Sequence, residues 1–239
     1  MRPFSTGKTV YSDARRAAPW WSNHHFKSDD GLWYGLATVR LLSIALLVVA
    51  ACGGSGQIET LNLSWRGVDD TPHPSAMVAQ SFAAAPLAFG LRDVRPDPTA
   101  VGQVEETGWV VHTKDNVATF CMTKVGEILA RAGARMNETP LAILETELLE
   151  YRVVEGGTFT GSVRLRAIVR RGGGGDAWSQ VYEGKSKRWG KSGNPDNYNE
   201  ALSNALEDAA SQMLNDAGFA HALVGDVAGA PPPPAPPGT

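Results

Sequence analysis

The chain has 239 residues, 43% of them hydrophobic, and a formal net charge of −3 at pH 7, which is typical of one globular domain with short extensions. The acidic balance argues against a dedicated nucleic-acid binder, whose pI is usually above about 9. Two cysteines and five histidines exclude a multi-bridge disulfide scaffold and a cysteine-rich zinc module.

A short apolar run from Leu41 to Ala51 follows Arg40 and leads into Cys52. It is shorter than the about 20 residues that a helix needs to span a bilayer. It fits the roughly 7–15-residue apolar region of a secretory signal, with a positive charge before it. The alternative interpretation is a buried core helix that carries an incidental cysteine.

The four residues that close this segment, Val49, Ala50, Ala51 and Cys52, resemble the bacterial lipobox. The resemblance implies that the Cys52 thiol is alkylated with diacylglycerol. It also implies that the chain is then cleaved just before Cys52, which becomes the lipid-bearing N-terminus. Because Gly53 is not an aspartate, the resemblance further implies sorting to the outer membrane.

The segment before the lipobox is longer than a secretory signal, which usually has about 15–30 residues. Residues 1–38 show no helical or strand period, so we interpret them as a non-native extension or as sequence upstream of the true translation start. A GTG codon at Val39 would supply that start. Residues 39–51 then form the lipoprotein signal, and residues 52–75 hold the lipidation site and a flexible tether.

The first elements after the lipidation site are predicted to be short and extended. Residues 58–65 alternate weakly between apolar and polar side chains, like a short strand. The prolines in 67–75 indicate a linker. A strand is predicted over 82–94, with Pro86 at an edge or an early position, and a shorter strand over 109–111.

An amphipathic helix is predicted from a cap at Asp115 or Asn116 to a stop at Gly133. Cys121 lies in its apolar stripe, so we interpret it as a small core residue. A catalytic nucleophile would need an adjacent base, which the sequence does not suggest. The stripe recurs at steps of three and four residues and consists of Val117, Phe120, Cys121, Val125, Ile128, Leu129 and Ala132.

Three alternating segments follow, over 140–154, 158–171 and 177–189, and glycine-rich turns separate them. In the second segment, the apolar residues are predicted to face the core and the arginines to face outward. That outer face is therefore predicted to be cationic.

A closing helix is predicted after Asn194 and Pro195, a cap followed by a proline suited to the first turn. Its buried stripe runs from Tyr198 to Leu214, and Gly218 is predicted to end it. Residues 225–239 are rich in proline and are predicted to be an extended, disordered tail.

These elements predict an α+β fold, with two amphipathic helices packed on one face of an antiparallel sheet, in a domain over residues 76–224. The lipobox and this order of elements resemble the YajG-like bacterial envelope lipoproteins. The resemblance rests on the helix end at 128–133, the turn at Glu155 and Gly156, the basic-apolar strand after it, and the helix over 198–214. It implies an accessory role in an envelope machine, with an unspecified partner.

The sequence predicts no catalytic residue, no metal site and no cofactor. His73, His112 and His221 are far apart and lack the spacing of metal ligands. Glu145 and Glu147 share one strand face and could form a carboxylate pair. A solvated sheet face is the simpler interpretation, because the sequence places nothing apolar around them that would raise a pKa.

The best binding candidate is a set of basic and aromatic residues in the predicted meander. One hypothesis is a surface that meets anionic lipid head groups, lipopolysaccharide or an acidic partner, since basic residues near an anionic membrane contribute about 1 kcal/mol each. The alternative is a strand edge that lysines protect from pairing. The set comprises Arg164, Arg166, Lys185, Lys187, Arg188, Trp189 and Lys191.

Two functions are therefore in play. The first is a lipid-anchored, non-enzymatic accessory or binding lipoprotein, held on the periplasmic side of the outer membrane by the lipid on Cys52. It would contact an envelope protein or anionic lipid, and we expect it not to bind nucleic acid. The second is a soluble cytoplasmic α+β domain whose basic-aromatic sheet surface binds nucleic acid or another anionic partner.

Overall fold

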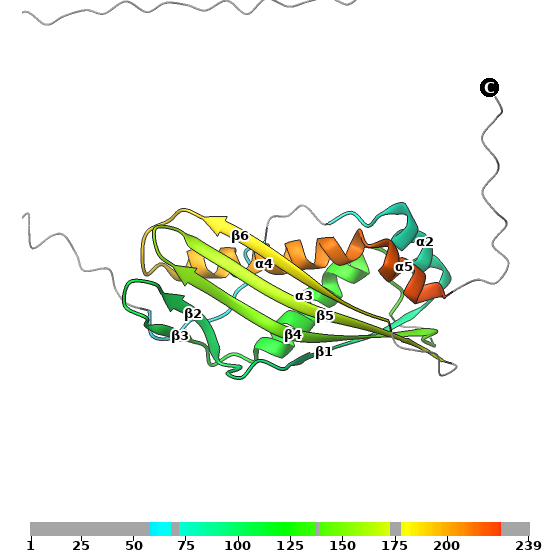
Figure 1. The fold of residues 1–239 in the computed structure, drawn as a ribbon, viewed down its shortest axis with the longest axis horizontal. Helices are drawn as coiled ribbons and strands as arrows, with labels where there is room; N and C mark the ends of the chain where they lie inside the picture. Colours follow the sequence, from blue (N-terminus) through cyan, green and yellow to red (C-terminus); the bar gives the residue numbers. More distant parts are fainter. Residues whose placement is uncertain (1–57, 68–71, 137–138, 173–177, 226–239) are drawn as a thin grey trace, which may run out of the picture. The chain divides into compact units, whose positions relative to one another are not determined.

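The structure is a computed structural model that describes residues 58–67, 72–136, 139–172 and 178–225 (Figure 1). The predicted lipobox and the proline-rich tail beyond residue 225 lie outside these residues. No helix in the described ranges is both long and apolar enough to cross a membrane. The elements in chain order are α2 (Ala76–Ala84), β1 (Leu87–Asp93), β2 (Ala100–Val104), β3 (Val110–His112), α3 (Val117–Arg131), β4 (Ala142–Glu155), β5 (Phe159–Arg171), β6 (Trp178–Arg188), α4 (Pro195–Leu214) and α5 (Ala217–Val224).

The strands form one six-stranded sheet in the order β3-β2-β4-β5-β6, with β1 also paired to β4. The α+β class is confirmed, and β4, β5 and β6 form the predicted antiparallel meander. The sheet is mixed rather than wholly antiparallel, because β1 and β2 both run parallel to β4. Parallel pairing needs a crossover connection, and α3 supplies it between β3 and β4.

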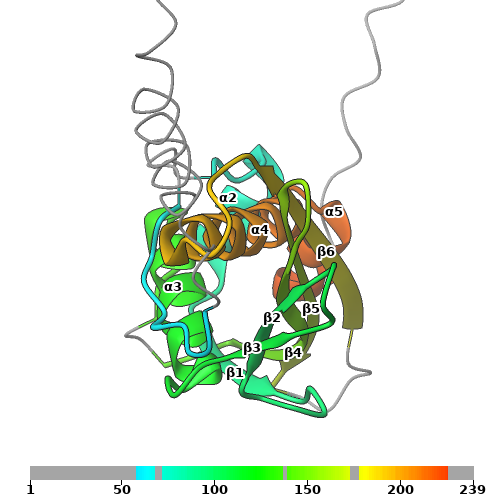
Figure 2. The ribbon, with the colours of Figure 1, turned by 90° about the vertical axis from the view of Figure 1, so that its left-hand side faces the viewer.

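Helices α3 and α4 cover one face of the sheet, as predicted (Figure 2). α3 contacts β1, and α4 contacts β5 and β6. The cap of α3 is Asn116, whose side chain accepts a hydrogen bond from Thr119 N, and the cap of α4 is Asn194. The predicted stripes of both helices lie in the core, with Phe120 alone only half-buried.

Two short helices that the sequence did not predict, α2 and α5, contact each other at one end of the molecule. The strand predicted over 82–94 begins only at Leu87, because Phe82 belongs to α2 and packs edge-on against Phe219 of α5, with ring centroids 6.1 Å apart. Gly218 does not end α4. It lies in the first turn of α5, where its N–H donates to the capping Asp216 carboxylate at 2.7 Å.

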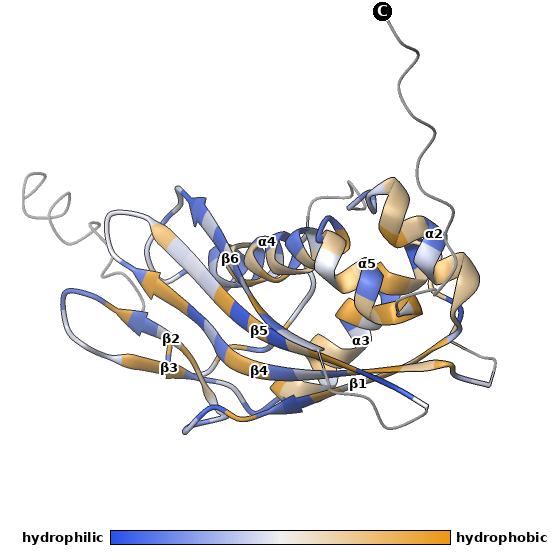
Figure 3. Cartoon of the chain, turned by 45° about the vertical axis from the view of Figure 1, so that its right-hand side comes forward, coloured by the Kyte–Doolittle hydropathy of each residue, from blue (hydrophilic) through white to orange (hydrophobic). Residues whose placement is uncertain are grey.

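Alternation along β4 and β5 separates a core face from an outer face, as the hydropathy colours show (Figure 3). In β4 the alternation shifts at a bulge between Leu148 and Glu150. An extra residue in one strand reverses the side-chain alternation beyond it. For this reason Tyr151, which the simple period places opposite Leu148, is buried together with it.

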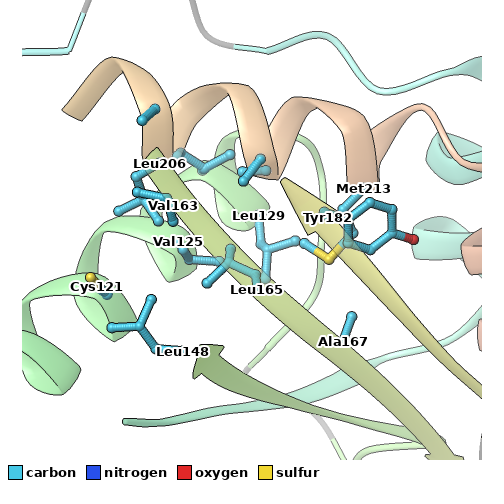
Figure 4. Packing of buried hydrophobic residues seen from close by; sticks show 14 of the residues in the cluster. Cys121, Val125, Leu129, Leu148, Val163, Leu165, Ala167, Tyr182, Leu206 and Met213 are labelled. Atoms are coloured by element: carbon cyan, nitrogen blue, oxygen red, sulfur yellow. The ribbon is translucent and has the colours of Figure 1, made fainter. Parts of the chain in front are cut away.

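The core between the sheet and the two helices is built from aliphatic side chains and includes Cys121 (Figure 4). Burial raises the pKa of the Cys121 thiol far above its ordinary value, so the reactive thiolate does not form at neutral pH. Its placement confirms the prediction of a packing residue. We expect Cys121→Ala to lower the free energy of unfolding by about 1 kcal/mol, as for a typical core substitution.

Thermal unfolding of the wild type and of Cys121→Ala measures this effect directly. The fold should be retained, since only packing changes. An unchanged melting temperature would contradict the packing role of this side chain.

Candidate functional site

The outer face of the sheet carries a ladder of ion pairs. Glu145 accepts from Arg170 at 2.5 Å, and Glu147 accepts from Arg166 at 2.7 Å. Glu147 also accepts from Arg92 of β1. The prediction of a cationic face is therefore wrong, because β4 places carboxylates next to the arginines of β5.

Two more residues of the predicted basic set lie on this face or at its edge. Arg164 stands opposite Glu150 of β4 and Glu183 of β6 in the strand register. Lys185 contacts Glu183 at 3.0 Å, and this pair lowers the pKa of the Glu183 carboxyl. These cations have carboxylates as neighbours within the sheet, so the face is a mixed-charge surface.

Glu147 is the most enclosed carboxylate of the ladder, with only 8% of its side chain exposed. The hydrogen bond from Arg92 holds the pKa of this carboxyl below its ordinary value of 4.5, against desolvation, which acts in the opposite direction. A carboxyl whose pKa is lowered by folding stabilises the fold above its unfolded pKa, and this stabilisation is lost as the pH falls through the folded value.

We therefore expect Glu147→Gln to destabilise the protein by about 1 kcal/mol at pH 7, the upper end for ion pairs whose arginines are solvent-screened. The difference from the wild type should shrink as the pH falls below about 4.5. Urea unfolding of both proteins at a series of pH values checks this. Glu145→Gln is the control, because among the described residues Glu145 forms an ion pair with Arg170 only and its side chain is 44% exposed. A pH-independent difference for Glu147→Gln would contradict the account.

The other members of the basic set lie at one end of the sheet, which we call the tip. The tip comprises the β2–β3 turn (residues 105–109), the β4–β5 turn (156–158), and the last residues of β6 with the β6–α4 loop (187–194). Lys187 and Lys191 are exposed here, and 77% of Trp189 is exposed. Arg188 turns back to α4, where it donates to Glu200 and to Asn197.

A buried carboxylate joins the three segments of the tip. Glu155, at the end of β4, is only 3% exposed. Its side chain accepts hydrogen bonds from Ser192, from Gly193 N at 2.8 Å and from Tyr198 of α4. Its carbonyl accepts from Glu105 N at 2.7 Å. Sequence reasoning placed Glu155 only in a turn, because its partners lie far along the chain.

The first described residues, 58–67, form an extended segment that is held to the domain and that we call the strap. Thr60 makes a single β-bridge to His112, so the strand predicted over 58–65 is reduced to one bridge. Further along, the backbone N–H groups of three strap residues donate to side chains of the domain. Leu63 N donates to Asp115, which precedes α3. Ser64 N and Arg66 N donate to Asn199 and Ser203 of α4. Side chains of α4 and of the loop before α3 therefore hold residues 63–66 against the domain.

A shallow hollow of about 320 Å³ lies beside the β4 bulge and is lined by Val110, Tyr151 and Arg152, among others. Arg95, which also lines the hollow, is nearly buried and pairs with Asp93 at 2.7 Å. Arg95 also donates to the carbonyls of Ala100 and Tyr151. These contacts fasten the loop between β1 and β2, so we assign Arg95 a structural role.

Metal-ligating side chains do not gather in the described part of the chain. No group of three or more His, Cys, Asp or Glu residues in those ranges could hold a metal ion. The predicted lipidation site at Cys52 and the lipobox residues Val49, Ala50 and Ala51 lie outside them. Lipidation therefore stays a prediction from the sequence.

Comparison with known proteins finds no matching family model and no matching curated protein. Among solved structures, protein XCC0632 from Xanthomonas campestris, of the family DUF330, has a TM-score of 0.44 at 11% identity, covering 66% of this chain and 93% of that chain. An uncharacterised protein has a TM-score of 0.42 at 12% identity, covering 63% and 97%. A PelC dodecamer from Paraburkholderia phytofirmans has a TM-score of 0.32 at 12% identity, covering 56% and 91%. We draw nothing about function from similarity at this level.

Proposed function

We propose that the protein is a lipid-anchored, non-enzymatic accessory or binding lipoprotein of the Gram-negative cell envelope. In this proposal a lipid on Cys52 holds it on the periplasmic side of the outer membrane, and the chain is a YajG-like lipoprotein. The observation that carries the proposal is the strap. The chain that follows the lipobox is bonded to β3, to α4 and to the loop before α3 almost as soon as the described residues begin.

This arrangement suits a domain held close to a membrane. From Cys52 to Ile58 the chain can span at most about 20 Å, at roughly 3.3–3.6 Å per residue. The strap is then fixed from Leu61, whose N–H donates to His112 O at 2.8 Å. A lipid on Cys52 would therefore keep the domain at the membrane surface and limit the orientations that it can adopt.

The side chains that could in principle act as a nucleophile or as an acid–base pair are engaged in packing or in ion pairs, which supports a binding role rather than a catalytic one. The Cys121 side chain is fully buried. Glu147, one of the two carboxylates that could have formed a catalytic pair, lies between Arg92 and Arg166. An accessory protein acts through a surface, and its partner in this proposal is an envelope protein or anionic lipid.

Metabolic labelling with an alkyne fatty acid tests the proposal. We expect the wild type to be labelled and Cys52→Ser to lose all label and remain as an uncleaved precursor, because acylation requires the thiol. Cys121→Ala is the matched control. It removes the other cysteine of the chain and should stay fully labelled.

Two results would contradict the proposal. Label retained by Cys52→Ser would place the lipid elsewhere. An unlabelled wild type would favour the soluble cytoplasmic domain instead, in which the apolar run before Cys52 is a buried helix.

A further inference from the structure

Two tryptophans are exposed at the tip. Trp189 follows β6 and is 77% exposed, and Trp109 precedes β3 and is 41% exposed. Figure 2 looks onto this end of the sheet, where the β2–β3 hairpin and the end of β6 face the viewer. Trp is among the larger apolar side chains, and a folded chain usually buries most of it.

Strand register places both tryptophans at the same end. Val104, at the end of β2, pairs with Glu155 at the end of β4. Arg188, at the end of β6, pairs with Phe159 at the start of β5. Trp109 and Trp189 therefore flank the β4–β5 turn on its two sides.

The exposure of Trp189 is not the result of a loosely attached loop. Glu155 accepts hydrogen bonds from Ser192 and Gly193, and Asn197 Nδ2 donates to Lys191 O at 3.0 Å. Arg188, directly before Trp189, is held by Glu200. The fold thus fixes the loop on both sides and leaves the indole ring outside.

The first described residue, Ile58, also lies at the tip. Trp109 Nε1 donates to the carbonyl of Ile58, the first described residue, at 3.3 Å. The next contact, the bridge from Thr60 to His112, lies on β3. The described residue nearest in sequence to the predicted lipidation site therefore lies beside one of the two exposed tryptophans.

We propose that the tip lies against the head-group layer of the membrane that holds the lipid anchor, with Trp109 and Trp189 at the interface. This inference rests on the proposed lipidation of Cys52. An indole combines an apolar ring with a polar N–H, which suits the boundary between head groups and acyl chains. A lipid chain and a second membrane contact together give firmer anchoring than one signal alone.

The contact is aromatic rather than electrostatic. The lysines at the tip, Lys187 and Lys191, are offset by two exposed glutamates of the β2–β3 turn, Glu105 and Glu106. Because the charges balance, the contact should persist at about 1 M salt, where the Debye length falls to about 3 Å.

The test uses the full lipidated chain in phosphatidylcholine vesicles that contain a lipid with a nitroxide on its head group. A fluorophore is attached at Lys191→Cys, in the Cys121→Ala background, and its quenching reports proximity to the head groups. The matched control is a fluorophore at Leu141→Cys. Leu141 is 59% exposed and precedes β4, whose 14 residues separate it from the tip by about 45 Å at roughly 3.3 Å per residue.

We expect several-fold stronger quenching at position 191 than at position 141, at low and at high salt. Adding Trp189→Ala should reduce the quenching at 191 without unfolding the protein, since this side chain lies outside the core. Equal quenching at the two positions would overturn the inference while leaving lipidation intact. If mass spectrometry of the same sample showed that Cys52 carries no lipid, the proposed function and the inference would both be overturned.

Discussion

Gly184→Val is expected to lower the free energy of unfolding by about 3 kcal/mol, the upper part of the range for overpacked cores. Gly184 lies on β6 beneath α4. A Cβ atom there would come within 1.9 Å of Ala205 O and 2.4 Å of Ala209 N. Both are backbone atoms of a helix, so they cannot rotate aside, and the whole of α4 must move away from the sheet.

The effect is specific to this contact. At Gly90, in β1, the position that a Cβ atom would occupy has no neighbouring atom within 4 Å. Gly90→Val should therefore be tolerated or slightly stabilising, because valine favours strands. Urea unfolding of both variants and the wild type gives the comparison. Equal stability of the two variants would show that α4 does not pack as closely on β6 as described.

Leu206→Asp is expected to prevent accumulation of folded protein. Leu206 is fully buried in the stripe of α4, where it faces the sheet beside Val163 (Figure 4). An isolated carboxylate in such a site costs several kcal/mol, which is a large part of the roughly 5–15 kcal/mol that stabilises a typical domain.

The amount of protein in cell extracts and the thermal melt measure the outcome. Leu206→Met is the matched control, since it preserves volume and should cost less than about 1.5 kcal/mol. Leu206→Asp protein that is abundant and melts like the wild type would mean that this face of α4 is not part of the core.

The elements that the sequence predicted well are long and strongly periodic. α3 and α4 show apolar residues at steps of three and four over 15 and 20 residues, and β5 alternates over 13 residues. α2 and α5 have 9 and 8 residues and gain stability from each other, through Phe82 and Phe219. Pairing of this kind is tertiary, so local periodicity does not reveal it.

The parallel arrangement of β1 and β2 on β4 was missed for a related reason. Strand direction depends on which strands become neighbours, and β2 is only five residues long with a glycine at its centre. The bulge in β4 that buries Tyr151 likewise arises from the pairing of β4 with β5. The alternation of apolar and polar residues along β4 alone does not reveal it.

The candidate site was predictable in its residue types but not in their relationships. The basic set was found in the sequence, yet the partners of its arginines come from other elements of the fold: Glu147 of β4 is 19 residues from Arg166, and Glu200 of α4 is 12 residues from Arg188. The tip depends on Glu155 binding a loop that begins far along the chain, with Ser192 at a separation of 37 residues. Such contacts follow from the fold and not from local spacing.

The most direct test of lipid anchoring is the mass of the N-terminal peptide of the protein extracted from membranes of the native host. We predict a peptide that begins at Cys52, carries a diacylglyceryl group on its sulfur, and is found without any peptide from residues 1–51. A peptide that runs through Cys52 from the preceding residues, with an unmodified thiol, would contradict lipid anchoring and the membrane contact built on it.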